Sequence, residues 1–351
     1  MRLTLTVIAA TVALVACGGG GGEDGPANPA NPANPANPAN PATPTTPTNP
    51  GPGGQAVITQ DNYVAVAREA LSTSAFLVDA SSFVLGADIS NADVLMRFAQ
   101  QQLLKLPQRG ARNPATAIGV SQSFTEPCDT GGSVTVTDTD LNGNGNVDPG
   151  DSVTVRPNNC GFGGQVLNGE LSLTLSSVSG IPGEDIYPWS VTGTLRFNNL
   201  RSQVGNNQST ASGDMTLTAS ARSRFSQEVS LSTPRFAVTS SYNGAVTNQT
   251  LSDYSTTVKT EASGAGLAGI SSAQGTLTTS AFGSLNVQTP TPFTRVGSQL
   301  YPSSGQAVVT GAGGSKVRVT ANSATSVTVS LDANGDGTYE TSVNKPWSEL
   351  R

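Results

Sequence analysis

The feature that most constrains the fold is a long series of segments, from about residue 117 onward, in which apolar residues alternate with serine, threonine or charged residues. Successive side chains of a β-strand point to opposite faces, so this alternation predicts strands with one buried and one solvent-facing side. Such strands are typical of antiparallel sheets. The clearest segments are SVTVTD (133–138), DSVTVRP (151–157), GELSLTLSS (169–177), VTGTLRF (191–197), GDMTLTASA (213–221), FAVTSSY (236–242), KVRVT (316–320) and SVTVSL (326–331).

The length of this region limits how the strands can be arranged. Residues 113–351 allow a dozen or more strands, separated by turns rich in Gly, Asn and Asp, with prolines at strand ends. A sheet of this size has to twist, and we expect it either to close into a barrel-like form or to fold into a sandwich. The predicted class is therefore mainly β, α+β in composition: a large, curved antiparallel sheet with two N-terminal helices packed on it.

Residues 55–112 carry the helical period instead. The first predicted helix covers residues 61–76 behind Thr59 as its cap, and its apolar face holds Tyr63, Val66, Ala67, Ala70 and Leu71. The second begins at Ser90-x-x-Asp93, which resembles a capping box, and continues with Val94, Leu95, Phe98 and Leu103. Because two amphipathic helices cannot bury their apolar faces alone, we expect both to lie on the β domain.

The N-terminus predicts export and lipidation. One arginine is followed by a short apolar run, Leu3 to Val15, which is typical of a signal peptide over residues 1–16. Leu14-Val15-Ala16-Cys17 resembles the bacterial lipobox, in which the cysteine receives the lipid anchor; an ordinary secretory signal is the alternative. Gly18, in place of Asp, favours sorting to the outer membrane, on its periplasmic face or at the cell surface. Residues 17–54 are rich in Gly and Pro and predict an extended, disordered tether.

Composition excludes several classes of function. The net charge is −6 and no basic stripe is present, so a nucleic-acid partner is not expected. Histidine is absent, which removes the commonest general base and the commonest transition-metal ligand. We identify no catalytic residues from the sequence.

Two acidic, glycine-rich loops are the candidate metal sites. With Asp140 as position 1, the first follows the twelve-residue calcium pattern of side-chain oxygens at alternate positions, a glycine at position 6 and a carboxylate at position 12. Its candidate ligands are Asp140, Asn142, Asn144, Asn146, Asp148 and Asp151. The alternative is a plain hairpin turn, since Asn-Gly between alternating segments is a strong hairpin signal.

The second loop matches the same pattern less completely. Its candidate ligands are Asp332, Asn334, Asp336, Thr338 and Glu340, while position 12 is Val343 and the closing carboxylate is missing. We therefore expect calcium there either to take a further ligand from elsewhere or to bind weakly, with the millimolar-range affinity typical of extracellular modules. In both loops the expected role of calcium is structural, because the ion would neutralise clustered carboxylates and fix a turn.

Cys128 and Cys160 predict a disulfide, as expected of a cysteine pair in an exported domain. Their mean position is residue 144, the centre of the first loop. The disulfide would therefore close the base of the hairpin that carries this loop at its tip. Two free thiols are the alternative.

Two blocks of sequence suggest a family. The first runs from Cys128 through GGSVTVT to GDSVTVRPNNC, and the second from YPSSGQAVVTGAGGSKVRVTA through LDANGDGTYE to KPWSEL. Together they resemble a group of uncharacterised proteobacterial envelope lipoproteins. The resemblance implies a cell-envelope location and a β-rich domain, and no activity.

The expected function is therefore a non-enzymatic, membrane-anchored lipoprotein with a structural or surface-interaction role toward envelope proteins or glycans. The alternative is a periplasmic carrier of a hydrophobic or lipid ligand, which requires an apolar cavity enclosed by the sheet and the helices.

Overall fold

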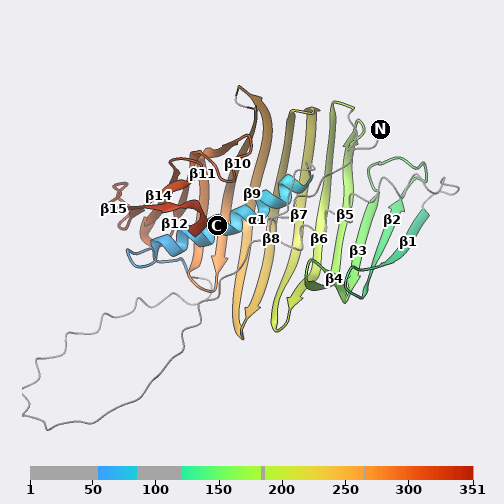
Figure 1. Cartoon of the computed structure of the whole chain (residues 1–351), viewed down its shortest axis with the longest axis horizontal. Coiled ribbons are helices and arrows are strands. Elements are labelled where there is room, and N and C mark those ends of the chain that lie inside the picture. Colours follow the sequence, from blue (N-terminus) through green and yellow to red (C-terminus); the bar gives the residue numbers. More distant parts are fainter. Residues whose placement is uncertain (1–53, 85–119, 183–185, 265, 351) are drawn as a thin grey trace, which may run out of the picture. The chain divides into compact units, whose positions relative to one another are not determined.

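The computed structural model describes residues 54–84, 120–182, 186–264 and 266–350. These residues form a single 15-stranded sheet and an α-helix that lies across it (Figure 1). Neighbouring strands pair antiparallel in chain order from β1 to β15, with one exception. Both β3 and the short β4 pair with β5. The expected antiparallel β architecture is confirmed, but the sheet is open and single, neither barrel nor sandwich.

The helix α1 spans Tyr63–Val84, and two short 3₁₀ turns are η1 (Ala312–Gly314) and η2 (Trp347–Glu349). The strands are β1 Val120–Pro127, β2 Ser133–Asp140, β3 Ser152–Asn158, β4 Cys160–Phe162, β5 Gln165–Ser179, β6 Trp189–Val204, β7 Asn207–Ser223, β8 Ser226–Tyr242, β9 Ala245–Ser263, β10 Gly266–Thr279, β11 Gly283–Val296, β12 Ser304–Thr310, β13 Lys316–Ala321, β14 Ser326–Asp332 and β15 Thr341–Pro346.

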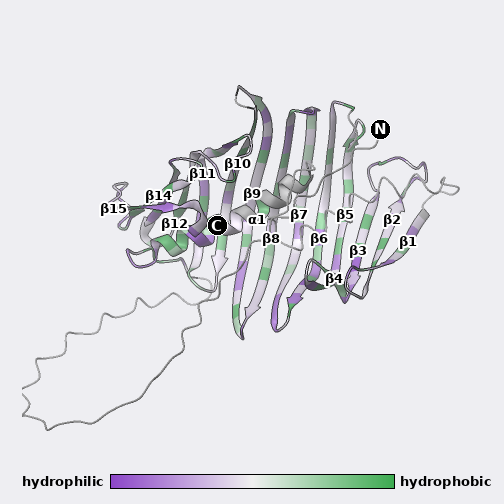
Figure 2. Ribbon diagram, in the orientation of Figure 1, coloured by the Kyte–Doolittle hydropathy of each residue, from purple (hydrophilic) through white to green (hydrophobic). Residues whose placement is uncertain are grey.

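Every alternating segment predicted from the sequence lies in a strand, within β2, β3, β5 to β8, β13 or β14, apart from the first residue of DSVTVRP. Apolar residues recur along these strands between polar ones (Figure 2). The long central strands extend well beyond the segments that alternate in the sequence. The alternation is lost in the rest of each strand because irregularities change which residues face the core. In β9, for example, the buried residues are Leu251 and then Tyr254, Thr256 and Val258, so the buried set changes parity at Asp253.

The change of parity in β9 is a bulge that a glycine in the next strand accommodates. Asp253 has a φ of 46°, and the β9–β10 register shifts between Gln274 and Thr276. Gly275 lies in this gap with a φ of 140°, and a Cβ atom there would be 2.5 Å from the Tyr254 Cα. Bulges with glycines bend a sheet and sharpen its twist. Gly275 therefore lets the backbone of β9 approach β10 where the sheet curves.

Replacing Gly275 with alanine is expected to lower the free energy of unfolding by about 2–3 kcal/mol, because the new methyl group collides with backbone atoms and the left-handed φ becomes strained. Gly264→Ala is the matched control, since Gly264 has no left-handed φ and, its chain neighbours aside, no atom of a described residue lies within 4 Å of the position that a Cβ atom would take there. Equilibrium unfolding in urea checks both. Equal effects from the two substitutions would contradict this account of the bulge.

The sequence predicts prolines at the ends of strands, and this prediction holds only in part. Pro127 and Pro346 do end β1 and β15, but Pro234, Pro290 and Pro292 lie inside β8 and β11. Each of these three lies where the register with a neighbouring strand shifts. Proline lacks an N–H group and is tolerated in sheets at bulges and edges, so the interruptions of the ladder make room for these residues.

Helix α1 confirms the first predicted helix and lies against β8 to β10 and β12 to β14 (Figure 1). Its buried residues include Tyr63, Val66, Ala67 and Ala70, as the helical period predicts. The predicted cap is different in the structure. The Asn62 side chain, rather than that of Thr59, makes the hydrogen bond, since its Oδ1 accepts the Thr59 N–H at 2.8 Å. The predicted second helix, which would begin at Ser90, lies outside the described residues, as do Cys17 and nearly all of the predicted tether.

Polar contacts fasten α1 to distant parts of the chain. The Ser74 hydroxyl lies 2.7 Å from the Tyr254 hydroxyl, and burial raises the pKa of Tyr254 to about 12. The Gln249 amide donates to Glu69 at 2.7 Å, and the Arg68 guanidinium donates to the Glu349 carbonyl at 2.7 Å. The helix is thereby joined to β9 and to the C-terminal turn. Within the described chain, no helix is both long enough and apolar enough to cross a membrane.

Candidate metal centre in the second acidic loop

The second acidic loop connects β14 to β15 and is organised by the carboxylate of Asp332, the last residue of β14. Asp332 is fully buried. Its Oδ1 accepts the N–H of Gly335 at 2.7 Å, and its Oδ2 accepts the N–H of Gly337 at 2.9 Å. Both glycines have left-handed φ values, which bend the chain around the carboxylate. Each carboxylate oxygen keeps a second lone pair, so Asp332 remains able to bind a cation.

Alternate residues continue the curl. The Asn334 Oδ1 accepts the N–H of Asp336 at 2.9 Å, and the Asp336 Oδ1 accepts the N–H of Thr338 at 2.7 Å. The hydrogen bond from Thr338, followed by that from the Asn334 amide, holds the pKa of Asp336 below its ordinary value. Asp336 is therefore ionised at neutral pH.

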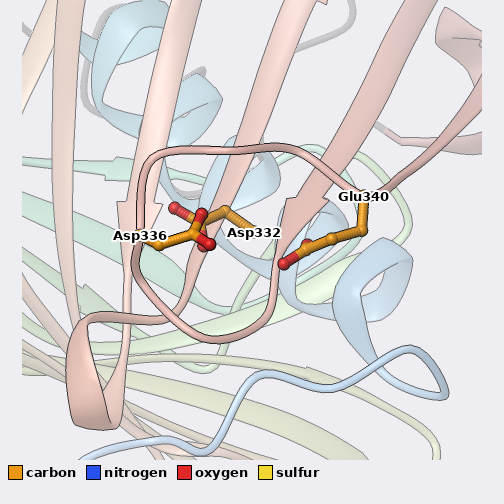
Figure 3. A group of neighbouring side chains, drawn as sticks. All are labelled: Asp332, Asp336 and Glu340. Atoms are coloured by element: carbon orange, nitrogen blue, oxygen red, sulfur yellow. The ribbon is translucent and has the colours of Figure 1, made fainter.

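Glu340 completes the loop. Its Oε2 accepts the N–H of Ala333 at 3.1 Å, so its carboxylate returns to the start of the loop. One oxygen from each of Asp332, Asp336 and Glu340 lies within 4.8 Å of the other two, and Figure 3 shows the three carboxylates side by side. Position 12, Val343, belongs to β15. Glu340, at position 9, brings the third carboxylate to the cluster.

Among the described residues, none of the three carboxylates forms an ion pair with a basic side chain. The ion pairs between described residues join other groups, namely Arg156 with Glu170, Arg196 with Asp214, Lys259 with Glu228 and Lys345 with Glu349. Arg318, on β13, lies instead over the Tyr339 ring, 3.8 Å from its centroid. Like charges this close repel each other and favour a bound cation. The hard oxygens of Asp332, Asn334, Asp336 and Glu340, with the Thr338 carbonyl, form a donor set of the kind that calcium takes.

The first acidic loop connects β2 to β3 and has the same internal hydrogen bonds at its start. The Asp140 carboxylate accepts the N–H groups of Gly143 and Gly145 at 2.6 and 2.7 Å. Asn142 and Asn144 accept the N–H groups two residues further along, at 3.1 and 2.7 Å. The predicted hairpin is confirmed, because β2 and β3 pair from Ser133–Asn158 to Thr139–Ser152 around the loop.

The acidic residues of the first loop have different partners. The Asn142 and Asn144 amides both donate to the Asp148 Oδ2, at 2.9 and 2.6 Å, and hold the pKa of Asp148 low. Asp151 accepts the N–H groups of Leu141 and Asp148 at 2.9 and 2.8 Å. Across the described ranges, the Asp332 group is the one cluster of three such ligands this close together. The sequence pattern is more complete in the first loop, yet the carboxylates converge in the second.

The predicted disulfide between Cys128 and Cys160 is confirmed, with Cα atoms 5.3 Å apart. Cys128 follows β1 directly and Cys160 begins β4, at the opposite ends of β2 and β3 from the first acidic loop. Main-chain bonds between Thr130 and Gly161 and between Gly161 and Gly131 lie beside it. The disulfide therefore fastens the base of this hairpin, as its spacing predicts.

The sequence reasoning missed two contacts that position the second loop. One is the stacking of Arg318 on Tyr339. The other is the approach of Gly335 to the η1 turn, where a Cβ atom would lie 2.8 Å from the carbonyl group of Gly314. The only sequence signal for this approach is the glycine pair Gly313–Gly314, which reads equally well as a simple turn. No protein-family model, curated protein or solved structure matches this chain.

Proposed function

We propose that this chain is an exported, lipid-anchored β-sheet protein with a structural role in the cell envelope, and that a calcium ion held by Asp332, Asp336 and Glu340 fastens the C-terminal end of its sheet. The observation that carries the proposal is the convergence of these three carboxylates, which form no ion pair with any described basic residue. The Asn334 side chain and the Thr338 carbonyl are the further ligands. The ion would neutralise the cluster and hold β15, an edge strand, in register with β14.

Among the described residues, three carboxylates converge only in the second loop, so the first loop is less suited to hold an ion. Its Asp148 and Asp151 carboxylates accept hydrogen bonds from asparagine amides and from the backbone, which stabilise the turn. We therefore assign it the role of a hairpin turn, with its candidate ligands Asp140, Asn142, Asn144 and Asn146 serving as turn formers.

Calcium is expected to raise the melting temperature of the protein. For a dissociation constant of about 0.1–1 mM, typical of extracellular modules, about 5 mM calcium adds roughly 1–2 kcal/mol to the free energy of unfolding. Thermal unfolding followed by circular dichroism, in calcium and in chelator, measures the shift. Magnesium at equal concentration should give a smaller shift, because it demands a tighter octahedral geometry.

A matched pair of variants locates the effect. Asp336→Asn combined with Glu340→Gln keeps the shape of the loop but removes two charges. This variant should melt at or above the wild-type temperature in chelator, because repulsion is relieved, and should gain nothing from calcium. Asp148→Asn, in the first loop, should keep the full calcium shift. An unchanged wild-type melting temperature would refute the proposed site.

The proposed anchor and location rest on sequence features. The lipobox ending at Cys17 supports a lipid-anchored N-terminus, and the Gly/Pro-rich stretch over residues 17–54 supports a spacer between membrane and sheet. Gly18 supports the outer membrane, with envelope proteins or glycans as partners. The disulfide supports an oxidising compartment, where such bonds persist.

Lipidation is the direct test of the anchor. Cells expressing the full chain should incorporate labelled palmitate into the protein, and Cys17→Ser should abolish the label and release the protein from the membrane fraction. Cys128→Ser should leave the label unchanged. Label retained in Cys17→Ser would contradict the anchor, while leaving the calcium site untouched.

A further inference from the structure

A small apolar cavity lies between α1 and the sheet, with a volume of about 70 Å³. Its lining includes Ala70 of α1, Ala273 of β10, Val287 and Phe293 of β11, Val309 of β12 and Trp347 of η2. These side chains are all buried. Two of the lining residues, Ala70 on the helix and Ala273 on the sheet, have small side chains that leave this space unfilled.

The sheet is interrupted beside this cavity. The β10–β11 ladder stops at the Ser271–Phe293 pair and resumes at Gln274–Gln288, so residues 289–292 face only two residues of β10. Pro290 and Pro292 have no N–H to contribute, and the Ala273 N–H donates instead to the Thr289 hydroxyl at 3.0 Å. Ser271, Ser272 and Thr289 line the cavity and are partly exposed. The cavity is thus apolar inside and bordered by hydroxyl groups where it meets solvent.

The lining chemistry determines what the cavity can hold. Among the described lining residues there is no acid and no base. The Ser74 hydroxyl, which also lines it, is already engaged with the Tyr254 hydroxyl and the Ala70 carbonyl. A charged or strongly polar group would lose its hydration without gaining a partner, whereas an apolar group would be stabilised. The lining therefore suits an apolar group.

The volume of the cavity limits the size of the apolar group that it can hold. Pockets for drug-sized molecules measure about 300–1,000 Å³, and an apolar cavity that accepts benzene measures about 150 Å³. This cavity is about half of the latter, too small for a whole lipid or a ring. We propose that it binds the end of a single unbranched aliphatic chain whose polar head stays at the hydroxyl-bordered mouth. This inference is independent of the calcium site and narrows the carrier function expected from the sequence.

Trp347 provides the measurement. The chain has two tryptophans, so Trp189→Phe leaves Trp347 as the sole source of tryptophan fluorescence. Straight-chain ω-bromoalkanols are suitable probes, because bromine quenches tryptophan fluorescence on contact. Quenching is expected to saturate, and affinity should rise about fourfold with each added methylene until the cavity is full, then level off. Partition into a loose apolar surface would instead keep rising with chain length.

Variants with larger side chains that fill the cavity are the control. Ala273→Leu and, separately, Ala70→Val place added carbon atoms in the cavity, and either should weaken probe binding at least about tenfold while the melting temperature stays equal or rises. Two variants from different elements guard against one that fails to fold. Quenching that is linear in probe concentration, or equal in the filled variants, would show a packing gap only and overturn the proposal.

Discussion

Replacing Trp347 with alanine is expected to lower the free energy of unfolding by about 3–5 kcal/mol, the range for deleting a buried large aromatic side chain. Trp347 is 2% exposed and is the largest fully buried side chain of the described chain. Its ring makes an edge-to-face contact with Phe293, 5.9 Å between centroids, and stacks on Tyr301 at 6.1 Å. The Nε1–H donates to the carbonyls of Pro302 and Ser323, both at 3.1 Å.

These contacts explain why so much depends on one residue near the C-terminus. Trp347 follows β15 directly and joins β11, the loop before β12 and the loop before β14. Arg68 of α1 reaches the same turn through the Glu349 carbonyl. Without the indole, the helix, the edge strand and the sheet lose their common contact.

Two variants separate packing from hydrogen bonding. Trp347→Phe should cost less, about 1–3 kcal/mol, because a ring remains but two carbonyls lose their shared donor. Ser348→Ala, at the exposed neighbouring position, should change stability by less than about 0.5 kcal/mol. Guanidinium unfolding of all three measures this order. A Trp347→Ala cost below that of Trp347→Phe would contradict it.

Removing the disulfide is expected to cost about 3–4 kcal/mol, because the bond between Cys128 and Cys160 closes a loop of roughly 33 residues in the unfolded chain. The double variant Cys128→Ala with Cys160→Ala is the test, measured by urea unfolding. The loss should be concentrated at the β1–β4 end of the sheet, where hydrogen exchange of β2 and β3 should accelerate most.

The reducing agent supplies the control. Reductant should destabilise the wild type to about the level of the double variant and should leave the double variant unchanged. Calcium should stabilise both forms equally, since the disulfide and the Asp332 cluster lie in different hairpins. A double variant as stable as the oxidised wild type would show that the bond adds nothing to the fold.

Local signals in the sequence predict local structure well. Strict alternation in SVTVTD and DSVTVRP predicts β2 and β3, and the Asn-Gly turn between them fixes their pairing. The disulfide between Cys128 and Cys160 is predicted from a cysteine pair in an exported domain, and the midpoint of the pair, which coincides with that turn, places the bond at the base of the hairpin. The apolar face of α1 follows from a helical period that begins at Tyr63.

Features that depend on two or more strands are not predictable in this way. The long strands lose their alternation where a bulge changes the buried set, as at Asp253, and the compensating Gly275 lies in another strand. Whether the sheet closes into a barrel is also not predictable from the sequence. A twisted sheet stays open or closes depending on its edge strands and on the elements that pack on its faces. The contacts through which Trp347 joins distant segments cannot be predicted from the sequence, because its partners, Phe293, Tyr301 and Ser323, are far from it in the chain.

The acidic cluster of the second loop shows the same limit within a single loop. Counting to position 12 favours the first loop, where Asp151 stands at the expected place. In the structure Asp151 is held by two backbone N–H groups, while Glu340, at position 9, turns back toward Asp332. A side chain's reach, rather than its number in the loop, decides which carboxylates meet.

Calorimetric titration of the chelator-treated, disulfide-intact protein with calcium tests the central claim most directly, because it counts sites. The account predicts one site per chain, lost in the variant combining Asp336→Asn with Glu340→Gln and retained in Asp148→Asn. Binding that survives the first variant and disappears in the second would place the ion in the other loop, and no binding at millimolar calcium would contradict the claim altogether.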